Sequence, residues 1–190
     1  MRFEPLEIAG AMLIRIEPHT DRRGLFARTV CVEEFRRHGL PADFVQASVS
    51  YNQRRGTVRG MHFQWPPSRE GKLVRCVRGA IHDVLLDIRP GEPTYLQHRA
   101  VVLDQENRDA VFIPPGVAHG FQTLAEESEI LYQMTDFHAP DLAGGMRWND
   151  PELGIDWPIR SDVTISERDA GYPDFDSGQF ARELAQHQQR

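Results

Sequence analysis

The sequence predicts an all-β protein, folded as a jelly roll or a similar barrel with few and short helices. Thirteen Pro and fifteen Gly are spread along the 190 residues and divide them into short segments, as is typical of β-sandwiches and barrels. Most segments are rich in β-branched or aromatic residues, and no helical crossovers separate them, which favours antiparallel pairing. The expected strands are Ala11–Glu17, Leu25–Cys31, Phe44–Tyr51, Thr57–Gln64, Lys72–Val77, Ala80–Arg89, Gln97–Leu103, Ala110–Ile113, Gly120–Leu124 and Glu129–Phe137.

One helix is predicted over Val32–His38. Its apolar residues Val32 and Phe35 lie three positions apart, two glutamates open it, and two arginines and a histidine close it before Gly39. This order of charges complements the helix dipole, and glycine readily adopts the left-handed conformation that ends a helix.

The expected strand Thr57–Gln64 carries the first candidate for chemistry. His62 shares a face with Gly60 and Gln64, whereas Met61 and Phe63 point the other way. A small, polar face lines a cavity more naturally than a core, so His62 is a candidate functional residue. The alternative is a histidine hydrogen-bonded at the rim of the barrel.

The strand Lys72–Val77 carries a cation beside apolar residues. Lys72 shares a face with Val74 and Cys76, and its ammonium group is a candidate for stabilising negative charge that develops next to a carbonyl. The alternative is a lysine that reaches solvent from an edge strand.

The segment Pro114–Phe121 contains the pattern P-x-G-x-x-H, a turn followed by a strand that begins with His119. This string resembles the second motif of the cupin superfamily, whose histidine is a metal ligand. The first cupin motif normally supplies H-x-H and then a glutamate, but here Gln64 replaces the second histidine and no glutamate follows at a suitable distance. A transition-metal site with three or four ligands is therefore not expected.

The expected domain spans residues 1–178, because 190 residues is the size of one ordinary domain. Residues 179–190 form a polar, Gln-rich tail with only Phe180 and Leu184 to bury, so a marginal helix or a frayed end is expected there. The segments Trp148–Pro151 and Asp156–Pro158 combine turn residues with tryptophan, which is typical of a long surface connection.

Composition and charge exclude several classes of protein. Lys and Arg number 22 against 28 Asp and Glu, a net charge of -6. This is the wrong sign for binding nucleic acid through many phosphates but permits a small phosphorylated ligand.

No apolar run approaches the roughly 20 residues that span a bilayer, and the first residues lack a signal-peptide pattern, so a cytoplasmic protein is expected. Cys31 and Cys76 lie far apart in apolar surroundings and are expected to be buried thiols.

Taken together, the motifs resemble the dTDP-4-dehydrorhamnose 3,5-epimerase family and its relatives that act on nucleotide-linked 4-keto-6-deoxy sugars. The resemblance implies a metal-free cupin-type jelly-roll barrel, no cofactor, and a homodimer with strand exchange. It extends over nearly the whole chain, at Asp21–Gly24, Phe44–Gln46, Val58–Gln64, Gly71–Cys76, Asp83–Arg89, Pro93–Thr94, Ile113–Phe121, Leu131–Tyr132 and Trp148–Pro151.

The resemblance also implies catalytic roles. Inverting a carbon beside a C4 ketone requires a base on one face of the sugar, a group that stabilises the enolate, and an acid on the other face. By similarity, His62 is the base, Asp169 orients it, Lys72 faces the enolate oxygen, and Tyr132 is the acid. Considered alone, Tyr132 would be a core aromatic residue and Asp169 an exposed turn acid.

The same resemblance implies a set of substrate-binding residues. Two arginines that each precede a glycine would bind the diphosphate, since glycine lets the backbone approach a ligand closely. Without the resemblance, the first arginine would belong to an ordinary turn. The expected binding residues are Arg23, Phe26, Gln46, Arg59, His119, His138 and Arg168.

The chain departs from the family pattern at four positions. The family commonly has Glu, Asn, Tyr and Lys where this chain has Arg28, Ser48, His138 and Arg168. Arg28, Ser48 and Arg168 lie near positions that face the nucleotide in the family, and the change from an acid to arginine reverses the local charge, so the identity of the nucleotide stays open. His138 replaces an aromatic residue that would flank the substrate, so the choice between C3, C5 or both stays open as well.

Three other functions compete with this interpretation. A keto-sugar isomerase of related fold would move the carbonyl between C3 and C4, with a different arrangement of histidines. A non-catalytic sugar-nucleotide-binding cupin would have a damaged catalytic set, whereas His62, Lys72, Tyr132 and Asp169 are all present. A metal-dependent cupin oxygenase or isomerase would contain iron or manganese, which elemental analysis detects.

Overall fold

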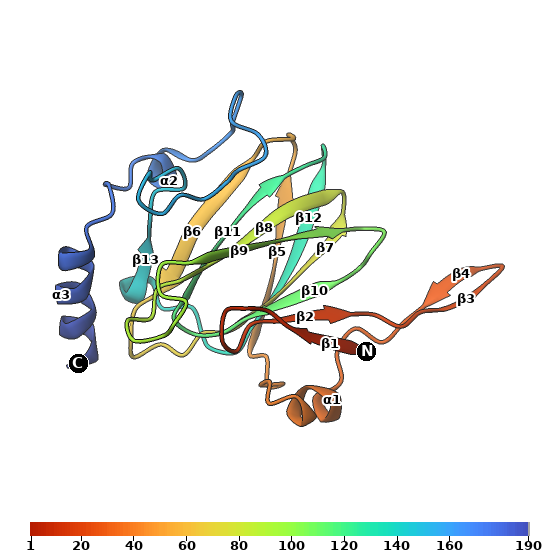
Figure 1. Ribbon diagram of the computed structural model, residues 1–190. Coiled ribbons are helices and arrows are strands. Elements are labelled where there is room, and N and C mark those ends of the chain that lie inside the picture. The colour runs from red at the N-terminus through yellow and green to blue at the C-terminus, as the bar shows by residue number, and fades with distance from the viewer. Residues whose placement is uncertain (190) are drawn as a thin grey trace.

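The computed structural model describes residues 1–189, which form two antiparallel β-sheets facing each other (Figure 1). The six-stranded sheet has the order β1-β2-β10-β7-β12-β5, and the five-stranded sheet has the order β13-β6-β11-β8-β9. This arrangement confirms the predicted all-β jelly roll. The strands of the two sheets are β1 (Arg2–Pro5), β2 (Met12–Arg15), β5 (Gln46–Asn52), β6 (Val58–Gln64), β7 (Lys72–Arg78), β8 (Ala80–Asp87), β9 (His98–Asp104), β10 (Ala110–Ile113), β11 (Val117–Thr123), β12 (Ser128–Met134) and β13 (Ala143–Gly145).

The main core lies between the sheets. Because side chains alternate along a strand, every second residue of each sheet faces the interior, and Lys72 and Tyr132 continue these inward faces at one end of the barrel. The predicted face of Lys72, Val74 and Cys76 is therefore confirmed. Residues that fill this core from both sheets are Val74, Cys76, Ile81, Leu85, Phe121 and Ile130.

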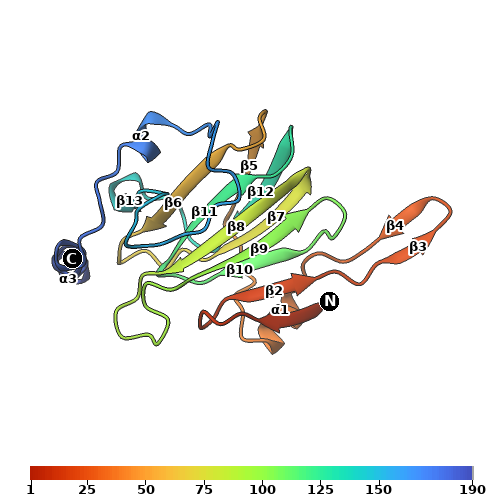
Figure 2. The ribbon, with the colours of Figure 1, turned by 45° about the horizontal axis from the view of Figure 1, so that its top comes forward.

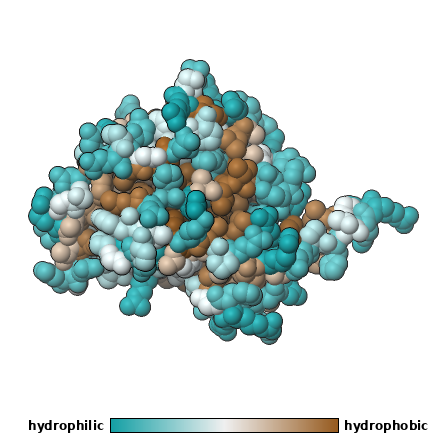
Figure 3. All heavy atoms as spheres, in the orientation of Figure 1, coloured by the Kyte–Doolittle hydropathy of each residue, from teal (hydrophilic) through white to brown (hydrophobic). Residues whose placement is uncertain are grey.

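A separate hairpin, β3 (His19–Asp21) and β4 (Gly24–Phe26), projects from the body of the molecule (Figures 1 and 2). The expected strand Leu25–Cys31 was wrong, because β4 ends at Phe26 and pairs only with β3. All six strand residues are exposed, so no core fixes a longer strand. Figure 3 shows hydrophilic residues at the tip of the projection and hydrophobic residues across the middle of the body.

The predicted helix is α1 (Val32–Arg37), which covers the outer face of the six-stranded sheet. Phe35 is fully buried and belongs to a cluster with Ile14, Leu73 and Phe112. Gly39 follows with φ +72°, the left-handed conformation expected of a glycine that ends a helix. The helix is therefore held by packing as well as by its order of charges.

The C-terminal segment covers the outer face of the five-stranded sheet. It contains β13, the short helices η1 (Pro140–Leu142) and α2 (Glu167–Ala170), and the longest helix, α3 (Ser177–Gln188). The expected tail is thus helical rather than frayed, because Phe180 is buried against Phe63 and Trp65. No helix within residues 1–189 combines the length and the apolar character needed to cross a membrane.

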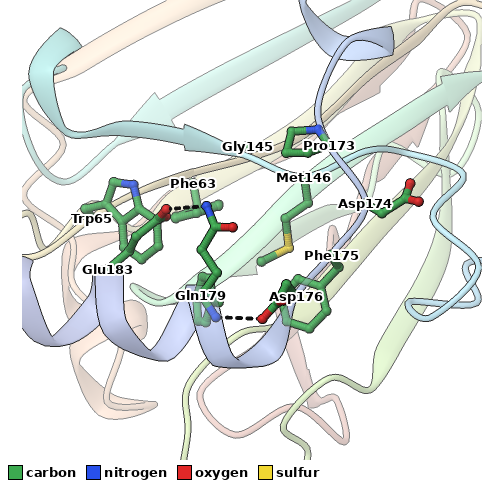
Figure 4. A pocket seen from close by; sticks show the side chains of 11 residues that line it. Phe63, Trp65, Gly145, Met146, Pro173, Asp174, Phe175, Asp176, Gln179 and Glu183 are labelled. Atoms are coloured by element: carbon green, nitrogen blue, oxygen red, sulfur yellow. Dashed lines mark hydrogen bonds between the residues drawn. The ribbon is translucent and has the colours of Figure 1, made fainter.

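Figure 4 shows the small cavity beneath α3, about 70 Å³ in volume. The Asp176 carboxylate accepts a hydrogen bond from Gln179 N at 2.7 Å, and the Gln179 side chain donates to Glu183 at 2.8 Å. The first contact caps the helix at its N-terminus. The aromatic side chains between the helix and the sheet leave no room here for a nucleotide or a sugar.

Strands β6 and β11 approach each other closely at two glycines. A Cβ on Gly60, which has φ +126°, would lie 2.5 Å from Gly120 Cα, and a Cβ on Gly120 would lie 2.6 Å from Met61 Sδ. Only glycine fits at these positions without displacing a neighbour. In the register of this pair, His62 lies directly opposite His119.

Candidate active site

A cavity of about 500 Å³ opens at one end of the barrel, between the two sheets. Its volume lies in the usual range for small-molecule sites. It brings together six of the residues expected from the sequence: Gln46, His62, Lys72, Tyr132, His138 and Arg168. His62 comes from the five-stranded sheet, whereas Lys72 and Tyr132 come from the six-stranded sheet. Both walls of the cavity therefore carry side chains that can transfer protons or stabilise charge.

Asp169 holds the imidazole of His62 from outside the barrel. Its Oδ1 lies 2.8 Å from His62 Nε2, and its Oδ2 accepts a hydrogen bond from Gly60 N at 3.2 Å. Ser166 caps α2 and accepts a hydrogen bond from Asp169 N at 3.1 Å. Asp169 is buried, which differs from the exposed acid that its local sequence indicates.

Burial lowers the pKa of His62 below its ordinary value, while the hydrogen bond and charge of Asp169 oppose this shift. The positive charge of Lys72 acts in the same direction as burial. His62 is therefore neutral near pH 7, the state in which an imidazole accepts a proton.

Tyr132 lies on β12, and its ring packs against the core while it also lines the cavity. Burial raises its pKa well above the ordinary value, and the charge of Asp83 adds to the shift. The phenol is therefore protonated across the whole neutral range.

Lys72 forms an ion pair that the sequence interpretation missed. Its Nζ lies 3.1 Å from Glu70 Oε1, and both side chains are largely buried in the cavity wall. The sequence did contain a signal, because Glu70 stands two positions before Lys72 and alternate residues of an extended chain share a face.

Other lining residues that were not expected as binding groups contribute polar or apolar atoms. Gln64 Oε1 accepts a hydrogen bond from Ala139 N at 3.0 Å, whereas its Nε2 is buried and has no partner within residues 1–189. The expected residue Gln46 accepts through Oε1 a hydrogen bond from His138 N, which ties the segment after β12 to β5. The lining residues besides Gln64 and Glu70 that were not expected are Ser48, Phe63, Met134, Ala143 and Gly144.

His119 and Arg59 lie beside the cavity rather than in its lining. His119 is buried, with Nε2 2.7 Å from Asp83 Oδ1, and its ring centroid lies 6.1 Å from that of Tyr132. Arg59 donates a hydrogen bond to Asn52 Oδ1 at 2.8 Å. The charge of Arg59 also influences the Tyr132 hydroxyl, so both residues belong to the surroundings of the catalytic candidates.

Arg23 and Phe26 are not brought to the cavity of their own chain. They lie on the projecting hairpin, where Arg23 forms an ion pair with Asp21 at 2.6 Å and Phe26 is 79% exposed. Arg28 contacts Glu34 at 3.0 Å and is also outside the cavity lining.

The residues at the cupin metal position do not fit a transition-metal site. His62 and His119 each approach a carboxylate through Nε2, and the position of the second motif histidine holds Gln64. Over the described part of the chain, no three or more His, Cys, Asp or Glu side chains are arranged to bind a metal ion.

Comparison with known proteins agrees with this geometry. The family model described as dTDP-4-dehydrorhamnose 3,5-epimerase matches residues 5–177. The enzyme of that name from Methanothermobacter thermautotrophicus is 42% identical over 173 residues, which is 90% of this chain and 92% of the relative. The one from Sinorhizobium fredii is 40% identical over 173 residues, or 91% of this chain and 89% of the relative.

A solved structure shows the same fold. The dTDP-4-dehydrorhamnose 3,5-epimerase from Bacillus anthracis, crystallised with TDP and PPi, superposes with a TM-score of 0.88 and 34% identity, covering 92% of this chain and 99% of the other. The similarity confirms the cupin-type jelly roll. By sequence and by structure, this chain belongs to the dTDP-4-dehydrorhamnose 3,5-epimerase family and is a carbohydrate epimerase.

Proposed function

We propose that the enzyme inverts C5, C3 or both in a dTDP-linked 4-keto-6-deoxyhexose by removing a proton from one face of the sugar and returning one to the other. The observation that carries this proposal is that His62 and Tyr132 line one cavity from opposite sheets. A ring bound between them has a base on one side and an acid on the other.

His62 acts as the base. When its Nε2–H donates to Asp169, the lone pair resides on Nδ1, which then takes the proton from the carbon beside the ketone. Asp169 fixes this tautomer and stabilises the imidazolium that forms. Its own position is fixed by the hydrogen bonds from Gly60 N and to the Ser166 hydroxyl.

Removal of the proton moves negative charge onto the C4 oxygen, and Lys72 stabilises that enolate. An ammonium group fixed in a largely buried wall stabilises developing charge more strongly than one in water. Tyr132 then protonates the carbon from the opposite face, and its raised pKa keeps it in the donor state.

The substrate is a dTDP-sugar, as supported by the family membership and by the TDP in the Bacillus anthracis relative. Arg168, His138 and Gln46 from the cavity lining would contact it. Arg23 and Phe26 would reach the site of a second copy through the projecting hairpin, so the active form is a homodimer. This arrangement explains why two expected binding residues lie far from their own cavity.

The first test is incubation of the His62→Ala variant with dTDP-4-keto-6-deoxyglucose in deuterated water. Exchange of carbon-bound hydrogen should fall by about 10³-fold or more, because no other group at this face takes the proton. NMR of the wild-type reaction shows which of C3 and C5 acquires label, and a carbonyl that moves to C3 would identify a keto-isomerase instead. Wild-type exchange in the variant would remove His62 from its role.

The Tyr132→Phe variant tests the other side of the ring. It should retain exchange at the face of the base but form inverted product about 10²-fold more slowly, since only the donor is lost. The ratio of exchange to product formation measures this separation. An equal loss of both would contradict the assignment of base and acid to two faces.

A further inference from the structure

Glu70 is an unusual residue for a cavity that binds an anionic sugar nucleotide. Among the thirteen described residues that line the cavity, it is the one carboxylate, and its side chain is only 8% exposed. A buried negative charge disfavours binding of a diphosphate and is itself costly to desolvate. Because the Glu70 carboxylate is unfavourable in this position, we expect it to have a specific function in the site.

The partner of Glu70 is Lys72, with Oε1 and Nζ 3.1 Å apart and the lysine side chain 17% exposed. The other cationic or titratable groups that line the cavity are His62, Tyr132, His138 and Arg168, and none of them forms a hydrogen bond or an ion pair with Glu70. The carboxylate is therefore committed to one ammonium group, the one placed to meet the enolate.

The backbone holds Glu70 in this position. Glu70 N donates a hydrogen bond to Ser68 Oγ at 3.2 Å, and Ser68 Oγ donates to Asp136 Oδ2 at the same distance. The next residue, Gly71, donates to Thr135 Oγ1 at 2.8 Å. The turn before β7 is thus tied to the end of β12, the strand that carries Tyr132.

We propose that Glu70 is a positioning residue that fixes the Lys72 ammonium group toward the enolate oxygen; this inference rests on the proposed role of Lys72. A lysine has a flexible four-carbon stem and three N–H donors. Glu70 accepts one donor and restricts the stem, which leaves the other two for substrate. Because Glu70 fixes the Lys72 ammonium group before the reaction, that group does not have to reorient when negative charge develops on the enolate oxygen.

The Glu70→Gln variant tests the proposal because it keeps the size of the side chain and removes its charge. The value of kcat should fall about 10- to 100-fold, the effect of misplacing a catalytic group by about 1 Å, while KM changes less than threefold. Glu70→Asp should retain more activity than Glu70→Gln. The matched control is Glu127→Gln, whose carboxylate pairs with Arg78 outside the cavity and which should leave both constants unchanged.

The decisive measurement is a double-mutant cycle with Lys72→Ala, read as the rate of deuterium exchange into the substrate. If Glu70 acts through Lys72, Glu70→Gln has no further effect in the Lys72→Ala background. A further loss there, or an unchanged kcat in Glu70→Gln alone, would overturn the proposal. Thermal denaturation of each variant separates these effects from loss of folded protein.

The same experiment separates this proposal from the one on which it rests. If Lys72→Ala retains the wild-type kcat, the enolate-stabilising role of Lys72 fails, and the role of Glu70 fails with it. If Lys72→Ala is impaired while Glu70→Gln is not, only the role of Glu70 fails.

Discussion

At the scale of single residues, the candidate site depends on the hydrogen-bond partner of each polar side chain. His62 and His119 lie opposite each other on neighbouring strands, yet each is bound to a different buried carboxylate. His62 also lines the cavity, whereas His119 is buried beside Tyr132. Of two residues of one type on neighbouring strands, only His62 is therefore accessible from the cavity.

Replacing Asp169 by Asn should change the pH dependence of the reaction in a defined direction. As the proposed base, His62 is active when neutral, so the rate should rise as pH increases through the His62 pKa. Asp169 raises this pKa, and without the carboxylate the rise should move to lower pH. The maximal rate should fall by about 100-fold or more, because the amide no longer stabilises the imidazolium.

The check is a profile of kcat/KM against pH for both proteins. A rise that moves to higher pH, or an unchanged profile with full activity, would show that Asp169 does not act on His62. The Glu127→Gln variant serves again as the control, because it neutralises a carboxylate outside the cavity lining.

Sequence reasoning predicted the site best where a residue lies on a regular strand. Alternation alone separates His62 from Met61 and places Lys72 on the face of Val74, and the structure confirms both. Glu70 was missed although it stands two positions before Lys72, because it precedes the strand, in a segment held by hydrogen bonds to distant residues such as Asp136 and Thr135. The burial of Asp169 depends on a contact across more than a hundred residues, which local sequence does not reveal.

At the scale of elements, α3 stabilises the wall that carries His62. Its Phe180 contacts Phe63, and Phe63 also lines the active-site cavity. The polar composition of this segment left a marginal helix and a frayed end as alternatives, and the packing of Phe180, Leu184 and His187 together with an N-terminal cap holds the helix on the sheet. The bounds of β4 were predicted wrongly because its apolar residues Leu25 and Phe26 resemble those of a core strand in the sequence but are exposed in the structure.

Phe180→Ala should lower the free energy of unfolding by about 3 kcal/mol, the usual cost of emptying a buried phenylalanine site. For a chain of this length, that loss corresponds to a decrease in Tm of about 6–12 °C. Gln186→Ala, an exposed change on the same helix, is the matched control and should leave Tm within about 2 °C. Equal Tm values for the two variants would show that α3 contributes little to the fold.

At the scale of the whole molecule, the projecting hairpin neither packs on the body of its own chain nor lines its own cavity. Phe26 and Leu25 are exposed on it, and Arg23 is 85% exposed, although the sequence resemblance predicts that Arg23 and Phe26 bind the substrate. Strand exchange between two copies would bury the apolar residues and complete both sites.

Complementation between two inactive variants tests this arrangement. Arg23→Ala and His62→Ala should each be impaired, but a heterodimer contains one site with both residues intact. Random assortment after co-expression should therefore restore about one quarter of the wild-type activity. Activity no higher than the average of the two separate variants would place Arg23 and His62 in the same copy or exclude Arg23 from the site.

His62 and Tyr132, the proposed base and acid, belong to different sheets, so the thickness of the packed interior sets the width of the gap in which a sugar would bind. Side chains such as Leu85 and Ile130 act as spacers between the two walls, and a close-packed interior transmits a change in their volume. Core residues outside the cavity can therefore tune the distance between its two walls, which makes them targets for directed evolution of this enzyme alongside the residues of the cavity itself.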